Sequence, residues 1–235
     1  MNEENHPYWK IYQRIITLRG TAPGRQSDNH LDILANECRF SFVEKQTSRF
    51  LFALQKTFGS YLEEKYFCKL REIYGYSVMS PPILKIIAEY SPLVELGAGN
   101  GYISYLLQNL GADLVPLERF PVEEGKNWFF NTSNLGLPSK GGKSWTPVIK
   151  GEATSLKQYQ SRNLLLCWPA RNLMANEALE HFPGKRLILV ADKTCCGNKS
   201  FYENLARDWI LELRVNTESW SMCHSETLEI YKRCA

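Results

Sequence analysis

The sequence has no run of apolar residues long enough to cross a membrane, and its first residues, Met-Asn-Glu-Glu-Asn-His, contain no apolar segment like that of a secretory signal. These absences predict a soluble, cytoplasmic protein without a membrane partner. Strong charge of one sign is also lacking, since 28 Lys and Arg residues stand against 25 Asp and Glu residues with no basic cluster. This balance favours a small molecule or a protein side chain over nucleic acid as a partner.

The seven cysteines show no C-x-x-C spacing. An odd number of cysteines without a secretion signal favours free thiols over a disulfide framework. Cys195 and Cys196 are adjacent, and Cys223 and His224 follow further along the chain. Because adjacent cysteines rarely both bind one ion, we predict no metal site.

The most informative pattern is at residues 93–101, which read Leu-Val-Glu-Leu-Gly-Ala-Gly-Asn-Gly. A short apolar run is followed by glycines at alternate positions and then by a helix-like stretch. A strand that enters a glycine turn at a helix N-terminus is the usual way to bind a nucleotide-like ligand. A dinucleotide-binding turn, G-x-G-x-x-G, would need glycine at position 102, where Tyr102 stands. Glu95 beside the turn would also repel a pyrophosphate, and an ordinary tight turn stays as the alternative.

With Glu95 two residues before the first glycine, this segment resembles motif I of the class I S-adenosylmethionine-dependent methyltransferases. The resemblance implies an acid at the end of the second strand that binds the ribose hydroxyls, and Glu118 stands there, although a surface acid beside Arg119 is the alternative. Gly151-Glu152-Ala153 resembles the turn that contacts the adenine amino group. The predicted cofactor is S-adenosylmethionine, and its predicted binding residues are Glu95, Gly97, Ala98, Gly99, Gly101, Glu118, Arg119, Glu152 and Ala153.

The remaining elements follow in an order that predicts an α/β fold. Apolar runs predict strands over 113–118, 145–151, 162–169 and 185–191, and helical spacing predicts helices over 102–110, 173–182 and 200–206. Alternating patterns over 209–215 and 226–232 predict a closing antiparallel pair. We therefore expect a doubly wound, mostly parallel, seven-stranded Rossmann-like sheet with its ligand at the carboxyl edge. Pro116 is awkward inside a central strand because it lacks a ladder donor.

The first 75 residues do not fit the sheet. Apolar spacing predicts helices over 32–42, 44–58 and 61–74, whereas the composition of 1–30 suggests partly irregular structure. We expect residues 1–75 to form an N-terminal helical extension and residues 76–235 the cofactor-binding domain. The extension is either a packing layer or a cap over the cofactor. Residues 121–144 are long for a loop and are expected near the ligand.

Candidate catalytic residues follow from where this fold presents its substrate. The fourth strand ends in Cys167-Trp168-Pro169-Ala170, which lacks the Asn/Asp-Pro-Pro-aromatic motif of methyltransferases that act on adenine or glutamine nitrogen. Methyl transfer is an in-line displacement that needs positioning, and a general base is optional. The candidates around the methyl group are Tyr76, Cys167, Trp168 and Asp192, although Trp168 could equally pack a loop against a helix.

A Trp-Pro pair after the fourth strand, with Tyr76-Ser77 ahead of motif I, also resembles a functionally uncharacterised methyltransferase-like group. The expected function is S-adenosylmethionine-dependent methyl transfer to an unidentified acceptor. A non-catalytic protein that uses the same fold as a binding or interaction module is the main alternative. A nucleotide-sugar or dinucleotide enzyme is disfavoured by Glu95 and Tyr102.

Overall fold

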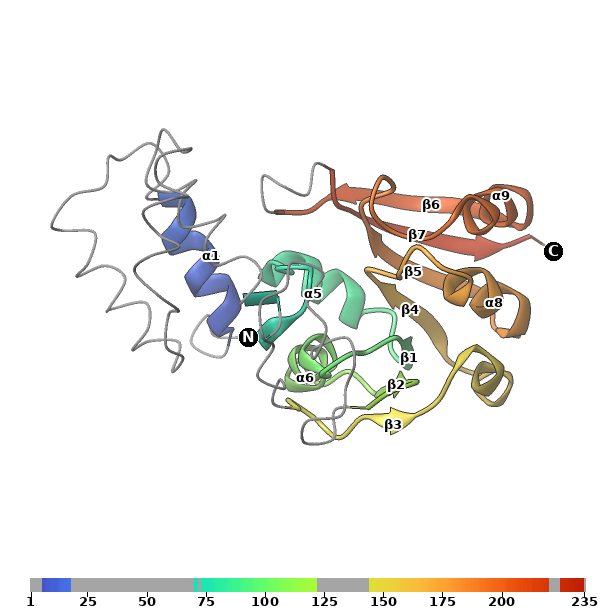
Figure 1. The fold of residues 1–235 in the computed structure, drawn as a ribbon, viewed down its shortest axis with the longest axis horizontal. Coiled ribbons are helices and arrows are strands. Elements are labelled where there is room, and N and C mark those ends of the chain that lie inside the picture. Colours follow the sequence, from blue (N-terminus) through green and yellow to red (C-terminus); the bar gives the residue numbers. More distant parts are fainter. Residues whose placement is uncertain (1–5, 18–69, 72, 122–143, 220–224, 235) are drawn as a thin grey trace, which may run out of the picture.

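The protein is described here by a computed structural model that covers residues 6–17, 70–71, 73–121, 144–219 and 225–234. One seven-stranded sheet runs through it in the order β3-β2-β1-β4-β5-β7-β6 (Figure 1). Neighbours among β1 to β5 are parallel, and β7 is antiparallel to both β5 and β6. The expected mostly parallel sheet with an antiparallel end is confirmed. The strands are β1 (Leu93–Leu96), β2 (Leu114–Glu118), β3 (Ile149–Lys150), β4 (Asn163–Cys167), β5 (Arg186–Ala191), β6 (Trp209–Asn216) and β7 (Thr227–Arg233).

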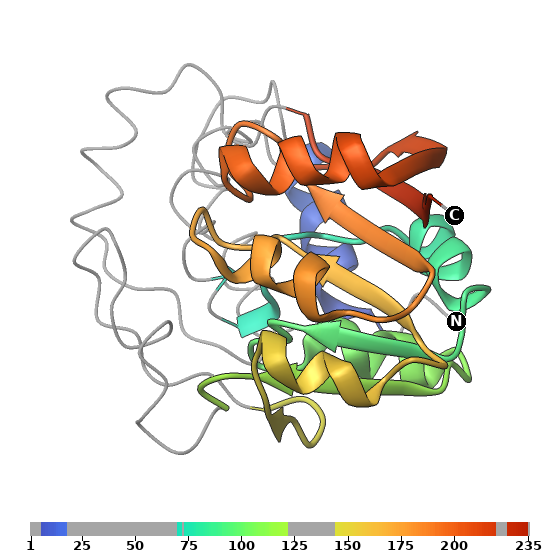
Figure 2. The ribbon, with the colours of Figure 1, turned by 90° about the vertical axis from the view of Figure 1, so that its right-hand side faces the viewer.

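Helices cover both faces of this sheet. Figure 2 shows α8 and α9 in front of the sheet and the blue helix α1 behind it. One core cluster joins α1, α5 and α6 to the sheet, and a second cluster joins α8, α9 and the 3₁₀ helix η2 to the opposite face. The helices are α1 (Pro7–Thr17), α5 (Pro81–Ala88), α6 (Tyr102–Asn109), η2 (Ala153–Gln158), α8 (Met174–His181) and α9 (Lys199–Asp208).

The continuous apolar runs of the central strands follow from this arrangement. In β5, Ile188 and Val190 pack on the α1 side, while Leu187 and Leu189 pack on the α8 side. Successive side chains of a strand point to opposite faces, so a strand covered on both sides must be apolar at every position.

The predicted third strand is shortened by contacts with distant parts of the chain. The third strand was expected over 145–151, but only Ile149 and Lys150 pair with β2. Trp145 is held elsewhere, because its backbone N–H donates to Asn100 (2.9 Å) and its indole N–H donates to Ile73 (2.8 Å). The short β3 also explains Pro116, which lies outside the two-residue pairing between β2 and β3.

The amino-terminal residues are more regular than predicted. Residues 7–17 form helix α1, which the expectation of partly irregular structure over 1–30 did not include. Tyr8, Ile11 and Tyr12 are buried at i, i+3 and i+4, in the same core cluster as α5 and α6. The predicted helices over 32–42 and 44–58 lie outside the described residues, as does most of 61–74 and of the 121–144 loop. The domain boundary at residue 75 therefore stays a prediction.

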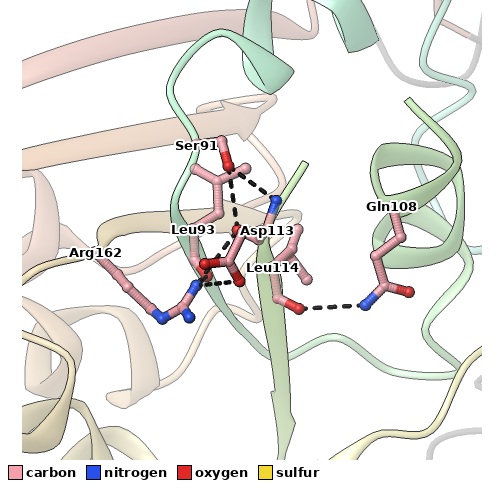
Figure 3. A network of polar contacts seen from close by, with 6 residues as sticks. All are labelled: Ser91, Leu93, Gln108, Asp113, Leu114 and Arg162. Atoms are coloured by element: carbon pink, nitrogen blue, oxygen red, sulfur yellow. Dashed lines mark hydrogen bonds and ion pairs between the residues drawn. The ribbon is translucent and has the colours of Figure 1, made fainter. Parts of the chain in front are cut away.

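The amino ends of β1, β2 and β4 are fixed by a polar network at the edge opposite the glycine turn (Figure 3). Arg162 donates to the Asp113 carboxylate (2.8 Å) and to the Leu93 carbonyl (3.2 Å). The Ser91 hydroxyl accepts from the Asp113 backbone N–H (2.9 Å), and Gln108 on α6 donates to the Leu114 carbonyl (3.2 Å). These contacts set the register of the strands that carry the site. Across the described ranges, no helix is long and apolar enough to cross a membrane.

Candidate functional site

The turn after β1 is built from glycines that adopt left-handed backbone conformations. The φ angles are 79° at Gly97, 57° at Gly99 and 76° at Gly101. The backbone N–H groups of Gly97 and Ala98 both donate to the Leu117 carbonyl of β2, and the Ala98 side chain is buried. Residues other than glycine are strained at positive φ. Because glycine occupies these positions, the turn presents mainly backbone to a ligand.

Gly101 also lies against side chains that leave no room for a β-carbon. A Cβ at this position would lie 2.9 Å from methyl groups of Thr146 and Val148, whereas a Cβ at Gly111, with a similar φ of 88°, would meet nothing within 4 Å.

We expect Gly111→Ala to lower the free energy of unfolding by about 1 kcal/mol through backbone strain alone. Gly101→Ala should lower it by about 2–3 kcal/mol, because overpacking adds to the strain. Urea denaturation of both variants checks this, and equal losses would show that the Thr146 and Val148 contacts are unimportant.

Glu118 ends β2 beside this turn. One of its carboxylate oxygens accepts from the Gly99 backbone N–H (3.1 Å), and the other accepts from the Phe120 N–H (3.1 Å). Its backbone carbonyl accepts from Gly151 N–H (3.0 Å), which brings the 151–153 turn to the same edge. The structure thus brings together the motif I glycines, Glu118 and the 151–153 turn.

Glu152, Arg119 and Ala153 lie at this edge with different exposure. The Glu152 carboxylate caps η2 by accepting from the Ser155 backbone N–H, and it forms a 3.8 Å ion pair with Arg119. Both of these side chains are largely exposed, so the ion pair contributes little to stability. The Ala153 side chain packs in the core, which leaves its backbone as the part available to a ligand.

Glu95 is buried in β1 on the face covered by α6. Its side chain is 2% exposed, and one carboxylate oxygen accepts from the Ser104 hydroxyl. Among the described residues, the other oxygen has no hydrogen-bond partner. Burial raises the pKa of this carboxyl group to about 7, and the nearby Glu118 charge adds to the rise. Ser104 was missed from the sequence, where a serine inside a predicted helix gives no signal.

Asn100, also missed from the sequence, fixes the glycine turn to its surroundings. It is 2% exposed, its amide donates to the Ile73 carbonyl (2.7 Å), and its side-chain oxygen accepts from the Tyr102 N–H (3.1 Å). Asparagine favours such local bonds at helix starts, so its place before Gly101 is the signal that could have identified it.

Tyr76 and Trp168, far apart in the sequence, stack on each other beyond the carboxyl end of β4. Their ring centroids are 5.1 Å apart and their planes differ by 8°. The Arg71 guanidinium lies 4.7 Å from the Tyr76 ring centroid. Trp168 has a φ of 50°, and its indole N–H donates to the Glu226 carboxylate. Sequence reasoning missed Glu226, because nothing distinguishes an acid at the start of a predicted edge strand.

The other two catalytic candidates have different surroundings. Burial raises the pKa of the Cys167 thiol well above its usual range, which keeps it protonated and poorly nucleophilic at neutral pH. The fully buried Asp192 carboxylate accepts from the Thr194 N–H (2.8 Å), the Thr194 hydroxyl (2.6 Å) and the Ser225 N–H (3.1 Å). These bonds hold the loop after β5, and a role for Asp192 at the methyl group stays a prediction. In the described parts of the chain, no three His, Cys, Asp or Glu residues are grouped as metal ligands.

Comparison with known proteins finds similar folds but no family. No family model matches the sequence, and no curated protein matches it. Among solved structures, Sp1610 of Streptococcus pneumoniae in complex with S-adenosyl-L-methionine is 14% identical, with a TM-score of 0.42 over 66% of this chain and 73% of that one. The magnesium protoporphyrin IX methyltransferase ChlM of Synechocystis PCC 6803 with bound S-adenosylhomocysteine is 12% identical, with a TM-score of 0.42 over 74% and 97%. The tRNA methyltransferase TrmK of B. subtilis is 15% identical, with a TM-score of 0.38 over 63% and 64%.

These similarities identify no substrate for the present chain, but they correct one expectation. The even charge balance was taken to favour a small molecule or protein side chain over nucleic acid. That expectation is corrected, since a tRNA methyltransferase is among the matched structures.

Proposed function

We propose that this protein binds S-adenosylmethionine at the carboxyl edge of β1 and β2 and transfers its methyl group to an acceptor. The observation that carries the proposal is the position of Glu118, whose carboxylate is hydrogen-bonded to the glycine turn. A carboxylate placed there can accept hydrogen bonds from ribose hydroxyls, since each of its oxygens has more than one acceptor site.

The buried charge around the turn fits a cationic ligand. One oxygen of Glu95 has no hydrogen-bond partner among the described residues, and a buried carboxylate of this kind is costly until it meets a donor or a positive charge. The cofactor carries an ammonium and a sulfonium group. A pyrophosphate would instead be repelled by Glu118 and by the ionised form of Glu95, which argues against a dinucleotide.

The chain's own residues would act mainly by positioning. When bound, the cofactor supplies a methyl group already activated by its sulfonium. The glycine backbone at 97–101, Glu118 and the 151–153 turn would hold its adenosine end, and Trp168 and Tyr76 are the candidates for the acceptor side. Holding the acceptor nucleophile in line with the methyl group can supply much of the rate enhancement without a general base. The acceptor class stays open among small molecules, protein side chains and nucleic acid.

A non-catalytic binding module is the second candidate, and one observation favours it. Two polar side chains among the catalytic candidates are already engaged, because the indole N–H of Trp168 bonds Glu226 and the Asp192 carboxylate bonds Thr194 and Ser225. Such a module would bind the cofactor without turnover.

We also propose that the chain falls within the methyltransferase-like group that carries a Trp-Pro pair after the fourth strand.

The test is calorimetric titration of S-adenosylmethionine and S-adenosylhomocysteine into wild type and Glu118→Ala. We expect binding by the wild type and an affinity at least about tenfold lower in the variant, equivalent to about 1.4 kcal/mol. Glu203→Ala is the control, because Glu203 is an exposed residue of α9 whose ion-pair partner within the described residues is Lys199. Binding that is equal in all three proteins would remove Glu118 from the site. Absence of binding by a folded wild type would leave the interaction module as the better proposal.

A further inference from the structure

Trp168 holds a backbone conformation that is rare for a large side chain. Its φ of 50° is in the left-handed region, where a β-carbon crowds the backbone. Such a backbone conformation is kept only where several surrounding contacts hold the residue in place, and residues in this conformation cluster at functional sites. Three contacts do so here, namely the backbone bond to the Val190 carbonyl (2.8 Å), the stack on Tyr76 and the indole bond to Glu226.

Glu226 collects donors from three separate parts of the chain. Its side chain is 3% exposed and lies just before β7. One oxygen accepts from the Ser77 hydroxyl (2.6 Å) and the Thr217 hydroxyl (2.8 Å), and the other accepts from the Trp168 indole. The segment before β1, the end of β4 and the end of β6 therefore meet at one carboxylate.

Stability alone is a poor explanation for this arrangement. No basic side chain pairs with Glu226 within the described residues, and burial raises the pKa of its carboxyl group. A buried carboxylate without a counter-charge is costly even when hydrogen-bonded, and an apolar cluster of the same size would often be more stable.

We propose that Glu226 is a positioning residue that fixes the ring of Trp168, and thereby the surface that the methyl acceptor meets at the end of β4. The proposal rests on the proposed methyltransferase function. Glu226 acts through Trp168, because its carboxylate accepts a hydrogen bond from the indole N–H. The position of the Trp168 ring depends on that bond, on the Tyr76 stack and on the strained backbone, and loss of the bond frees the ring to move.

Strand β7, which follows Glu226, offers a matched control. Glu229 is 1% exposed and accepts from Tyr231, but it is paired with Arg214 (2.7 Å) and Lys193 (3.4 Å). Its partners lie on β6, on β7 and just after β5, and none is Trp168 or Tyr76. Glu229→Gln therefore removes one buried carboxylate from β7 without touching the Trp168 contact.

The decisive variant is Glu226→Gln, which changes one side-chain oxygen into an amide. The remaining oxygen can still accept from Ser77 and Thr217, while the amide N–H₂ faces the indole N–H, so two donors oppose each other. We expect the indole N–H resonance of Trp168, identified by its loss in Trp168→Phe, to move upfield in Glu226→Gln and to stay in place in Glu229→Gln. An unchanged resonance in Glu226→Gln would overturn the proposal.

A second measurement tests the functional consequence. Methyl-tritiated S-adenosylmethionine is supplied with the protein, RNA and small-molecule fractions of a cell extract as acceptors. Glu226→Gln and Trp168→Phe should each lower the transfer rate roughly 10- to 100-fold, since small misplacements cost this much. Affinity for S-adenosylhomocysteine should stay within about twofold, and the double variant should be no slower than the slower single variant.

Other outcomes separate the two proposals. Additive losses, or transfer by Glu226→Gln at the wild-type rate, would contradict the positioning role. A wild type that binds no S-adenosylhomocysteine, or that methylates no fraction, would contradict the proposed function instead. In that case the indole resonance still decides whether Glu226 positions Trp168.

Discussion

Deletion of residues 1–17 is expected to leave the remaining chain unable to form a stable domain. Helix α1 buries four large side chains in the cluster that also holds α5, α6 and the centre of the sheet. His6 is fully buried, its Nε2–H donates to the Met79 carbonyl (2.6 Å), and its Nδ1 is hydrogen-bonded to the Tyr102 hydroxyl (3.0 Å). It therefore joins α1 to the helix that follows the glycine turn. The four side chains are Tyr8, Trp9, Ile11 and Tyr12.

The size of this effect follows from the area that α1 covers. Burying one such side chain contributes about 1.5–3 kcal/mol, so four contribute roughly 6–12 kcal/mol, which is comparable to the whole stability of a typical domain. Circular dichroism and thermal unfolding of the protein that lacks residues 1–17 measure the loss of stability. Tyr8→Ala should cost about 3–5 kcal/mol by itself, whereas Gln13→Ala, at an exposed position of the same helix, should be nearly neutral. A deleted protein that melts like the wild type would instead support a separable extension before residue 76.

The sequence predicted the parts of the fold that depend on neighbouring residues. Helix α6 begins directly after Gly101 and is followed by Gly111, and both glycines have the positive φ that side chains disfavour. The continuous apolar runs over 162–169 and 185–191 predicted the buried central strands β4 and β5. The place of Glu118 beside the turn could be predicted because one helix and one short strand separate it from the last glycine.

Contacts between distant segments could not be predicted in the same way. Ser77 and Glu226 are 149 positions apart, and they meet only because β7 lies beside β5 in the sheet. The order of the strands decides such pairs, and a single sequence does not encode that order in any local pattern. Helix α1 was missed for a related reason. Its burial depends on Tyr102 and α5 far along the chain, while the polar residues after it dominate the composition.

A second large effect is expected from the titration of Glu95. Burial raises the pKa of its carboxyl group from the ordinary 4.5 to about 7, with Ser104 on α6 opposing the rise and Glu118 on β2 adding to it. Between these two pH values the folded protein keeps a proton that the unfolded chain has released. The contribution of Glu95 to stability is therefore full below pH 4.5 and is lost as the pH rises through 7, by about 3 kcal/mol in total.

His6 produces a pH dependence of the opposite sign. Its burial lowers the pKa of the imidazole from 6.5 to about 4, so between these values the unfolded chain binds the proton and stability rises with pH. The two effects are similar in size and overlap between about pH 4.5 and 6.5. We therefore expect wild-type stability to change little in that window, with the effect of Glu95 visible only in comparison with a variant that lacks its carboxyl group.

The comparison is urea denaturation of wild type and Glu95→Gln at a series of pH values. Because His6 contributes equally to both proteins, the stability of Glu95→Gln relative to wild type should increase by about 3 kcal/mol from pH 4.5 to 7.5. Glu203→Gln, which alters an exposed carboxylate of α9, should follow the wild type in parallel. A difference between Glu95→Gln and wild type that does not vary with pH would show that Glu95 is ionised in the folded protein.

If Glu95 does hold a proton, a cationic ligand beside the glycine turn must displace it, because a positive charge stabilises the ionised carboxylate. Titration of S-adenosylmethionine in buffers of different ionisation enthalpy should then detect proton release near pH 6.5 in the wild type and none in Glu95→Gln.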